Sequence, residues 1–277
     1  MKNQVLRELL RRPGVRFGLA VLLIFVLGAI LADWVAPHPP DALVTLYAEP
    51  PQVTHPFGTD DLGRDILSRA LHGGRISLSV GFIAVAIALL IGTLYGAFAG
   101  YFGGVMDHTM MRFVDIMLAF PSIFLILAIQ AMLTPNIYNV MIVIGITSWM
   151  GVARLVRAEF LSIKERPYVE AARAIGASHS RIIFRHILPN ALYPILVAGT
   201  LGMAGAILIE SALSFLGMGV QPPMASWGNM LEDAQAYMRE AWWMAVIPGV
   251  FITTTVLSLY AVGEGLREVL SPHGDKN

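Results

Sequence analysis

ISLSVGFIAVAIALLIGTLYGAFAGYF, residues 76–102, is an apolar stretch without a single charged side chain. About 20 mostly apolar residues in a helix are enough to cross the roughly 30 Å hydrocarbon core of a bilayer. A barrel strand would alternate between apolar and polar residues over about ten positions, and this stretch does not alternate. The stretch therefore predicts a helix that spans a membrane.

Five further segments have the same character. The six predicted spans are residues 17–36, 76–102, 113–133, 140–156, 191–215 and 242–262. The chain is 56% apolar and only 14% charged, whereas a soluble domain carries about a quarter charged residues. We therefore expect an all-α membrane protein with six transmembrane helices. The spans divide the chain into a tail (1–16), the first span, an external segment (37–75), a core of five spans (76–262) with a cytoplasmic loop at 159–190, and a second tail (263–277).

The basic residues predict the orientation. With the N-terminus in the cytoplasm, six spans place both termini inside, together with fifteen of the 19 Lys and Arg residues. The fifteen are Lys2, Arg7, Arg11, Arg12, Arg16, Arg112, Arg154, Arg157, Lys164, Arg166, Arg173, Arg181, Arg185, Arg267 and Lys276. Only Arg64, Arg69, Arg75 and Arg239 fall outside. This bias follows the positive-inside rule, so we expect a multi-pass protein with cytoplasmic termini.

The basic tail followed by the apolar run at 17–36 also fits a cleavable signal peptide. That apolar run exceeds the ~7–15 residues of a usual signal core, and further long runs follow it. We therefore expect an uncleaved first span.

Several function classes are excluded by what the sequence lacks. There is no cysteine, which excludes disulfides and thiolate chemistry. No Gly-x-x-x-x-Gly-Lys-Ser/Thr loop occurs, so we expect no nucleotide site of the usual P-loop kind in this chain. The net charge is zero, which gives no basic surface for nucleic acid. The histidines singled out as possible metal ligands, His55, His72, His108, His179 and His186, do not cluster at ligand spacing. We expect no bound metal or cofactor and no enzymatic activity.

The loop PYVEAARAIGASHSRIIFRHILPN, residues 167–190, contains two helix signals. Pro167 suits the first turn of a short helix, and Gly176 suits its end. Ser178 is a good cap for a second helix, which Pro189 is expected to close before the fifth span. The loop therefore predicts a helix–turn–helix on the cytoplasmic face.

This loop resembles the coupling loop of ABC importer permeases. The matching residues are Glu170, Ala171, Ala172, Gly176, Leu188 and Pro189. His186 departs, because the family has Ile at that position. The resemblance implies docking on a separate ATPase subunit, with the small alanines seated in a groove and Glu170 and Arg173 setting the orientation by charge. The alternative is an amphipathic helix that meets only lipid headgroups or its own bundle.

Four further motifs resemble the dipeptide, oligopeptide and nickel permeases, and specifically their second permease type. They are GTDDLGRDILSR (58–69), MRFVDIMLAFP (111–121), ESALSFLGMGVQPPMASWG (210–228) and AWWMAVIPG (241–249). The resemblance implies the type I ABC importer permease fold in a bacterial inner membrane. It also implies a related second permease as heterodimer partner, two subunits that bind ATP and Mg, and an extracytoplasmic substrate-binding protein. Peptides are the expected substrate, and nickel is the alternative.

Charged residues at other positions are candidates for transport or for structure. Glu210 in the fifth span either lines the pathway or forms structural hydrogen bonds. Asp115, near the cytoplasmic start of the third span, has Arg112 three residues earlier on the same face. An ion pair within the bundle, with Arg112 as the partner, is expected for Asp115, and a role in transport is the alternative. The external Asp60, Asp61, Arg64 and Asp65 either contact the binding protein or form a local salt-bridged cap.

Two other classes of membrane protein are compared with the permease. An ion-coupled carrier would carry several ionisable residues at mid-membrane, and Glu210 alone is thin support for one. An intramembrane hydrolase would need a nucleophile and a base, or metal ligands, and the spans offer no such pairing. Gly92, Gly96 and Gly100 share one face of the second span, which predicts close packing against another helix.

Overall fold

The computed structural model describes residues 2–270, with side chains from Arg7 onward, so Lys276 and the side chain of Lys2 lie outside the described part. The elements are α1 (Lys2–Arg11), α2 (Pro13–Ile30), α3 (Ala32–Val35), α4 (Ile66–Phe102), α5 (Gly104–Ala119), α6 (Ser122–Met132), α7 (Ile137–Lys164), α8 (Pro167–Ala174), α9 (His179–Arg181), the π-helix η1 (Ile182–Ile187), α10 (Leu188–Phe215), α11 (Trp227–Ala234), the short 3₁₀ turn η2 (Gln235–Tyr237) and α12 (Trp243–Leu270). No strand occurs in residues 2–270, where only two isolated bridges are formed. The all-α prediction is confirmed.

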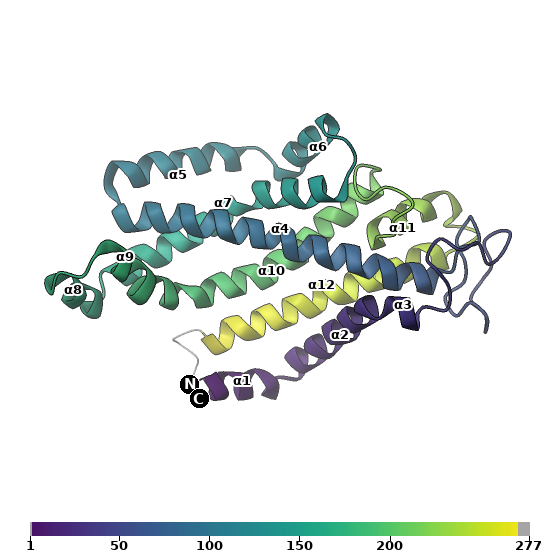
Figure 1. Cartoon of the computed structure of the whole chain (residues 1–277), viewed down its shortest axis with the longest axis horizontal. Helices are drawn as coiled ribbons and strands as arrows, with labels where there is room; N and C mark the ends of the chain where they lie inside the picture. The colour runs from purple at the N-terminus through teal and green to yellow at the C-terminus, as the bar shows by residue number, and fades with distance from the viewer. Residues whose placement is uncertain (1, 271–277) are drawn as a thin grey trace.

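The long helices lie side by side and define two ends of the molecule (Figure 1). One end holds α1, α8, α9 and the last turns of α12. The other end holds the segment at 36–65 and α11. The loops predicted to be cytoplasmic and those predicted to be external are thus separated along the bundle.

Five helical runs are long and apolar enough to cross a membrane, namely α2, α4, α7, the run from His179 to Phe215, and α12. The predicted third span differs from a single helix, because α5 and α6 meet at an angle of 81°. Pro121 lacks an N–H group and disfavours helical geometry at the preceding residue, and Phe120 is extended (φ −90°, ψ 130°). The described chain therefore has five spans, or six if the bent pair counts as one.

The second span begins earlier than predicted. α4 starts at Ile66 instead of residue 76, because Asp65 caps it by accepting a hydrogen bond from the Ser68 amide at 2.8 Å. Its glycine face packs directly on α7, as the spacing predicts. A Cβ atom on Gly96 would lie only 2.3 Å from the carbonyl oxygen of Ala153. α4 and α7 are therefore in close backbone contact.

The helix after Ser178 does not end at Pro189, so that part of the prediction is wrong. The chain stays helical from His179 to Phe215. Pro189 cannot donate the backbone hydrogen bond of its turn, and its ring would clash with the preceding turn of a regular α-helix. The wider turns of η1, directly before it, accommodate the proline.

Candidate functional site

The turn after α8 is a glycine-dependent helix end. The Gly176 amide donates to the Arg173 carbonyl at 3.0 Å, and the Ala177 amide donates to the Ala172 carbonyl at 3.0 Å. Gly176 has φ +79°, a conformation that side chains rarely adopt. This pair of bonds is the Schellman motif, and it confirms that Gly176 ends the helix. Ser178 caps α9 as predicted, because its hydroxyl accepts from the Arg181 amide.

Ala171 and Ala172 lie on different sides of α8. Ala171 is exposed, whereas Ala172 is only 7% exposed. Val169 is fully buried on the same side as Ala172, in an apolar cluster with Phe160 and Ile182. The structure therefore divides the predicted two-alanine patch: Ala171 is exposed to a partner, and Ala172 is largely covered although it lines the hollow beside the helix.

Beside α8 lies an open hollow of about 610 Å³. One wall is formed by α8, and the other by Arg181, Arg185 and His186. Apolar side chains stand in the open next to it, with Ile175 86% exposed. Exposed apolar side chains rimmed by charges are typical of a surface that another protein covers.

The remaining coupling-loop candidates differ in their exposure. Glu170 and Arg173 are exposed on α8, where they flank Ala171. Leu188 is half-buried and packs against the apolar cluster, while Pro189 is exposed. Glu170, Ala171 and Arg173 therefore form the accessible surface, which we call the coupling face.

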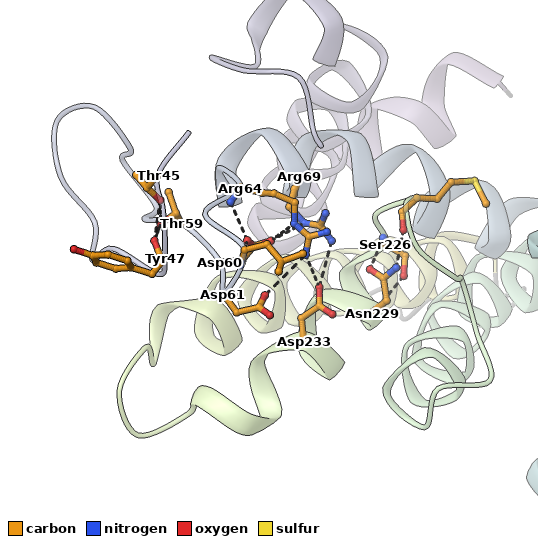
Figure 2. Close-up of polar contacts among 12 residues, drawn as sticks. Thr45, Tyr47, Thr59, Asp60, Asp61, Arg64, Arg69, Ser226, Asn229 and Asp233 are labelled. Carbon is orange, nitrogen blue, oxygen red and sulfur yellow. Dashed lines mark hydrogen bonds and ion pairs between the residues drawn. The ribbon is translucent and has the colours of Figure 1, made fainter. Parts of the chain in front are cut away.

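The charges of the segment predicted to be external form a buried ion network (Figure 2). Arg64 Nε donates to Asp60 Oδ2 at 2.6 Å, and Arg69 Nε lies 3.4 Å from the same oxygen. Both arginines also reach Asp233 Oδ2, at 3.2 and 3.3 Å. Asp60 and Arg69 are 4% and 2% exposed. The network ties residues 58–65 and the start of α4 to α11, and we call it the external cap.

Of the two predicted roles for these charges, binding-protein contact or a local salt-bridged cap, this geometry is the one that the cap requires. Asp65 is buried as the cap of α4, and Asp61 is the most accessible of the four predicted candidates, with its side chain 22% exposed. Contact between these residues and a binding protein stays a prediction. The carboxylates of Asp60, Asp61 and Asp233 converge closely enough for a metal ion. The two guanidinium groups among them already supply the balancing positive charge.

Glu210 is 0% exposed and lies at the meeting point of three helices. Ser214 Oγ donates to its carboxylate at 2.8 Å, and Ser77 Oγ of α4 does so at 3.3 Å. Ser77 Oγ also accepts from the Trp227 amide of α11 at 3.2 Å. Glu210 was predicted either to line the pathway or to form structural hydrogen bonds. The bonds described here are structural, since they hold α10, α4 and α11 together.

Asp115 forms an ion pair, but not with Arg112. Its partner is Arg154 of α7, so the predicted partner is wrong. A second ion pair joins the same two helices, where Arg157 Nη2 of α7 donates to Asp107 Oδ2 of α5 at 2.6 Å. Arg112 and Asp115 both lie on α5, so a pair between them would not connect α5 to another helix. The two observed ion pairs do, since both join α5 to α7.

A family model described as "Binding-protein-dependent transport system inner membrane component" matches residues 92–273. The chain belongs to this family. A second model, described as the N-terminal TM domain of oligopeptide transport permease C, matches residues 3–52 of the permease. The resemblance to the dipeptide and oligopeptide permeases is thereby confirmed.

Individual relatives and structures agree with this assignment. The permease is 42% identical over 276 residues to a dipeptide transport system permease protein of Alkalihalophilus pseudofirmus, covering 98% of this chain and 89% of that one. It is 43% identical over 266 residues to a di/tripeptide transport system permease protein of Pseudomonas aeruginosa, covering 94% and 88%. A chain of the inward-facing MetNI methionine ABC transporter shares the fold, with a TM-score of 0.58 and 18% identity over 72% of the permease and 95% of that chain.

Sequence reasoning missed two members of the external cap of the permease. Arg69 and Asp233 are separated by 164 residues, so only the fold brings them together. Arg69 stands at the end of a motif rich in aspartate, which was the one available signal. Asp233 follows the motif at 210–228 and had no such signal.

Proposed function

We propose that this permease forms the translocation pathway of an ATP-driven peptide importer in a bacterial inner membrane. Its partners are a related second permease, two subunits that bind ATP and Mg, and an extracytoplasmic binding protein. Peptide is favoured because the relatives at 42% and 43% identity are named as dipeptide and di/tripeptide permeases. The observation that carries the proposal is the coupling face, an exposed helix surface beside an open hollow at one end of the bundle.

The proposed mechanism converts closure of the ATPase subunits into movement of α8. ATP binding drives the two subunits together, and the docked coupling face moves with them as a rigid body. The movement passes through the helical run from His179 to Phe215 into the membrane. ATP shifts the transporter between inward and outward access only because these two conformations bind nucleotide with different affinities.

We further propose that both termini are cytoplasmic. α1 and the last turns of α12 lie at the same end as α8 and α9 (Figure 1). That end carries most of the basic residues, including Arg7, Arg173 and Arg267. The positive-inside rule assigns such an end to the cytoplasm.

The proposal predicts the energy source of uptake. In proteoliposomes that contain the full assembly, uptake of a labelled dipeptide continues after ionophores collapse the proton and sodium gradients. Uptake stops when ATP is withdrawn. Uptake that follows an ion gradient instead indicates a secondary carrier, and uptake of nickel without peptide indicates the nickel alternative.

A crosslinking experiment tests the docking. The chain contains no cysteine, so single introduced cysteines are unambiguous. Ala171→Cys, on the exposed side of α8, is expected to crosslink to cysteines placed in the ATPase groove. Ala172→Cys is the matched control and is expected to crosslink less than Ala171→Cys, because Ala172 is 7% exposed where it lines the hollow. Equal crosslinking, or none from Ala171→Cys across the groove, contradicts this docking.

A further inference from the structure

We propose that Tyr101 and His179 are positioning residues that transmit the movement of the coupling segment, residues 165–187, to α4. This inference rests on the proposed function. Tyr101 lies in the last turn of α4, and His179 begins α9. The Tyr101 hydroxyl and His179 Nδ1 are 2.7 Å apart, and either group can donate the hydrogen bond.

The Tyr101 side of the contact is packed by its surroundings. Tyr101 is 8% exposed and belongs to the apolar cluster beneath α8. Its ring meets the His179 ring edge-on, with centroids 5.6 Å apart. Within residues 7–270, this is the one side-chain hydrogen bond that joins the coupling segment to a helix that does not run on from it. It therefore gives α4 a direct link to α9.

The inner end of α4 is also fixed to its neighbour α7. Lys164 Nζ, in the last turn of α7, donates to the carbonyl of Gly100 at 3.1 Å. Gly96 and Gly100 pack on the α7 backbone, so α4 and α7 are expected to move together. If His179 moves and Tyr101 follows it, α4 and α7 therefore move as well.

α4 reaches from the coupling segment to the external cap. It is one unbroken helix of 37 residues, which at about 1.5 Å per residue is roughly 55 Å long. At its outer end Arg69 contacts Asp233 of α11. The Ala70 carbonyl accepts from Trp227 Nε1 at 2.9 Å. α4 thus links the contact at Tyr101 with α11 and adds a second route to the one through α10.

The test removes one hydroxyl group and keeps the ring. Tyr101→Phe retains the packing but not the hydrogen bond, and His179→Ala removes the partner. His179→Asn keeps a hydrogen-bonding group near the place of Nδ1 and serves as the rescue variant. The matched control is Tyr95→Phe, which removes from the same helix a hydroxyl that donates to the Met110 carbonyl at 3.0 Å.

The readout is the number of dipeptides imported per ATP hydrolysed by the purified assembly in proteoliposomes. A hydrogen bond of this kind shifts an equilibrium by about two- to tenfold, so Tyr101→Phe and His179→Ala are expected to lower this ratio by that factor. ATPase binding and ATP hydrolysis stay near the wild-type level. The double variant is expected to be no worse than either single variant. His179→Asn and Tyr95→Phe are expected to keep the wild-type ratio.

Three results would overturn the inference: a wild-type ratio in Tyr101→Phe, additive losses in the double variant, or an equal loss in Tyr95→Phe. Failure of the proposed function is distinguished by the wild-type assembly, which would then show no ATP-driven uptake at all. A second readout is thiol labelling of Met238→Cys, an exposed position beyond α11. Its labelling is expected to change with ATP in the wild-type background and to change less in Tyr101→Phe.

Discussion

Gly176→Asp is expected to lower ATP-driven uptake at least tenfold while leaving the permease inserted and folded. A Cβ atom at Gly176 meets no atom within 4 Å, so the new side chain fits in the free subunit. Aspartate tolerates positive φ better than most residues, which limits the strain at φ +79°. The loss arises in the docked state, because a side chain and a negative charge are placed beside the coupling face, where a partner would have to seat closely.

Gly176→Asn is the matched control, since it has the same size and the same tolerance of positive φ without the charge. It is expected to keep most of the uptake. The measurements are dipeptide uptake, membrane content of the subunit, and recovery of the ATPase subunits by affinity purification. Normal uptake in Gly176→Asp, or an equal loss in Gly176→Asn, contradicts the docking of this turn on a partner.

Arg69→Met is expected to destabilise the permease by about 3–5 kcal/mol, the usual cost of removing one partner from a buried ion network. Arg69 is 2% exposed and neutralises both Asp60 and Asp233. Without it these carboxylates face each other with Arg64 as the one remaining cation of the described network. The measurement is thermal unfolding of the purified protein in detergent, with exposed Arg239→Met as the control that removes an external arginine from the surface.

The same variant has a characteristic pH dependence. Burial raises the pKa of Asp233 above its ordinary value of 3.8, and the charges of Arg69 and Arg64 act in the opposite direction. Loss of Arg69 therefore raises the pKa of Asp233 in the folded state further. A raised carboxyl pKa costs stability once the group ionises, so the cost is largest above the folded pKa and falls as protonation proceeds. The loss of unfolding free energy in Arg69→Met, relative to the unsubstituted protein, is expected to be smaller at about pH 5 than at about pH 7.5. A deficit independent of pH contradicts the assigned role.

The sequence predicts most of the span positions and the whole turn after α8. Span positions depend on long apolar runs, which residue types report directly. The turn depends on Gly176 and Ser178, whose backbone and capping preferences are local. Predictions of this kind need no knowledge of neighbouring helices.

Most of the errors concern relations between helices, and the expected helix end at Pro189 is the exception. Asp115 pairs with Arg154 on another helix, and Arg69 pairs with Asp233 far along the chain. A helix surrounded by lipid and protein is apolar on all sides, so periodicity does not indicate which face meets a neighbour. The burial of Ala172, next to the exposed Ala171, was not predicted because both residues are small and apolar, so residue type does not show which of the two faces the bundle. The break before Pro121 had a signal in the proline, but a proline alone does not set the 81° angle.

The most direct test of the account is a structure of the assembled transporter, purified with its ATPase subunits and trapped with a non-hydrolysable ATP analogue. The account predicts that Ala171 of α8 and Ile175, directly after it, are buried against an ATPase subunit and that α8 moves with that subunit between nucleotide-free and nucleotide-bound states. An α8 that stays bare to solvent in both states, with the ATPase subunits attached elsewhere, would contradict it.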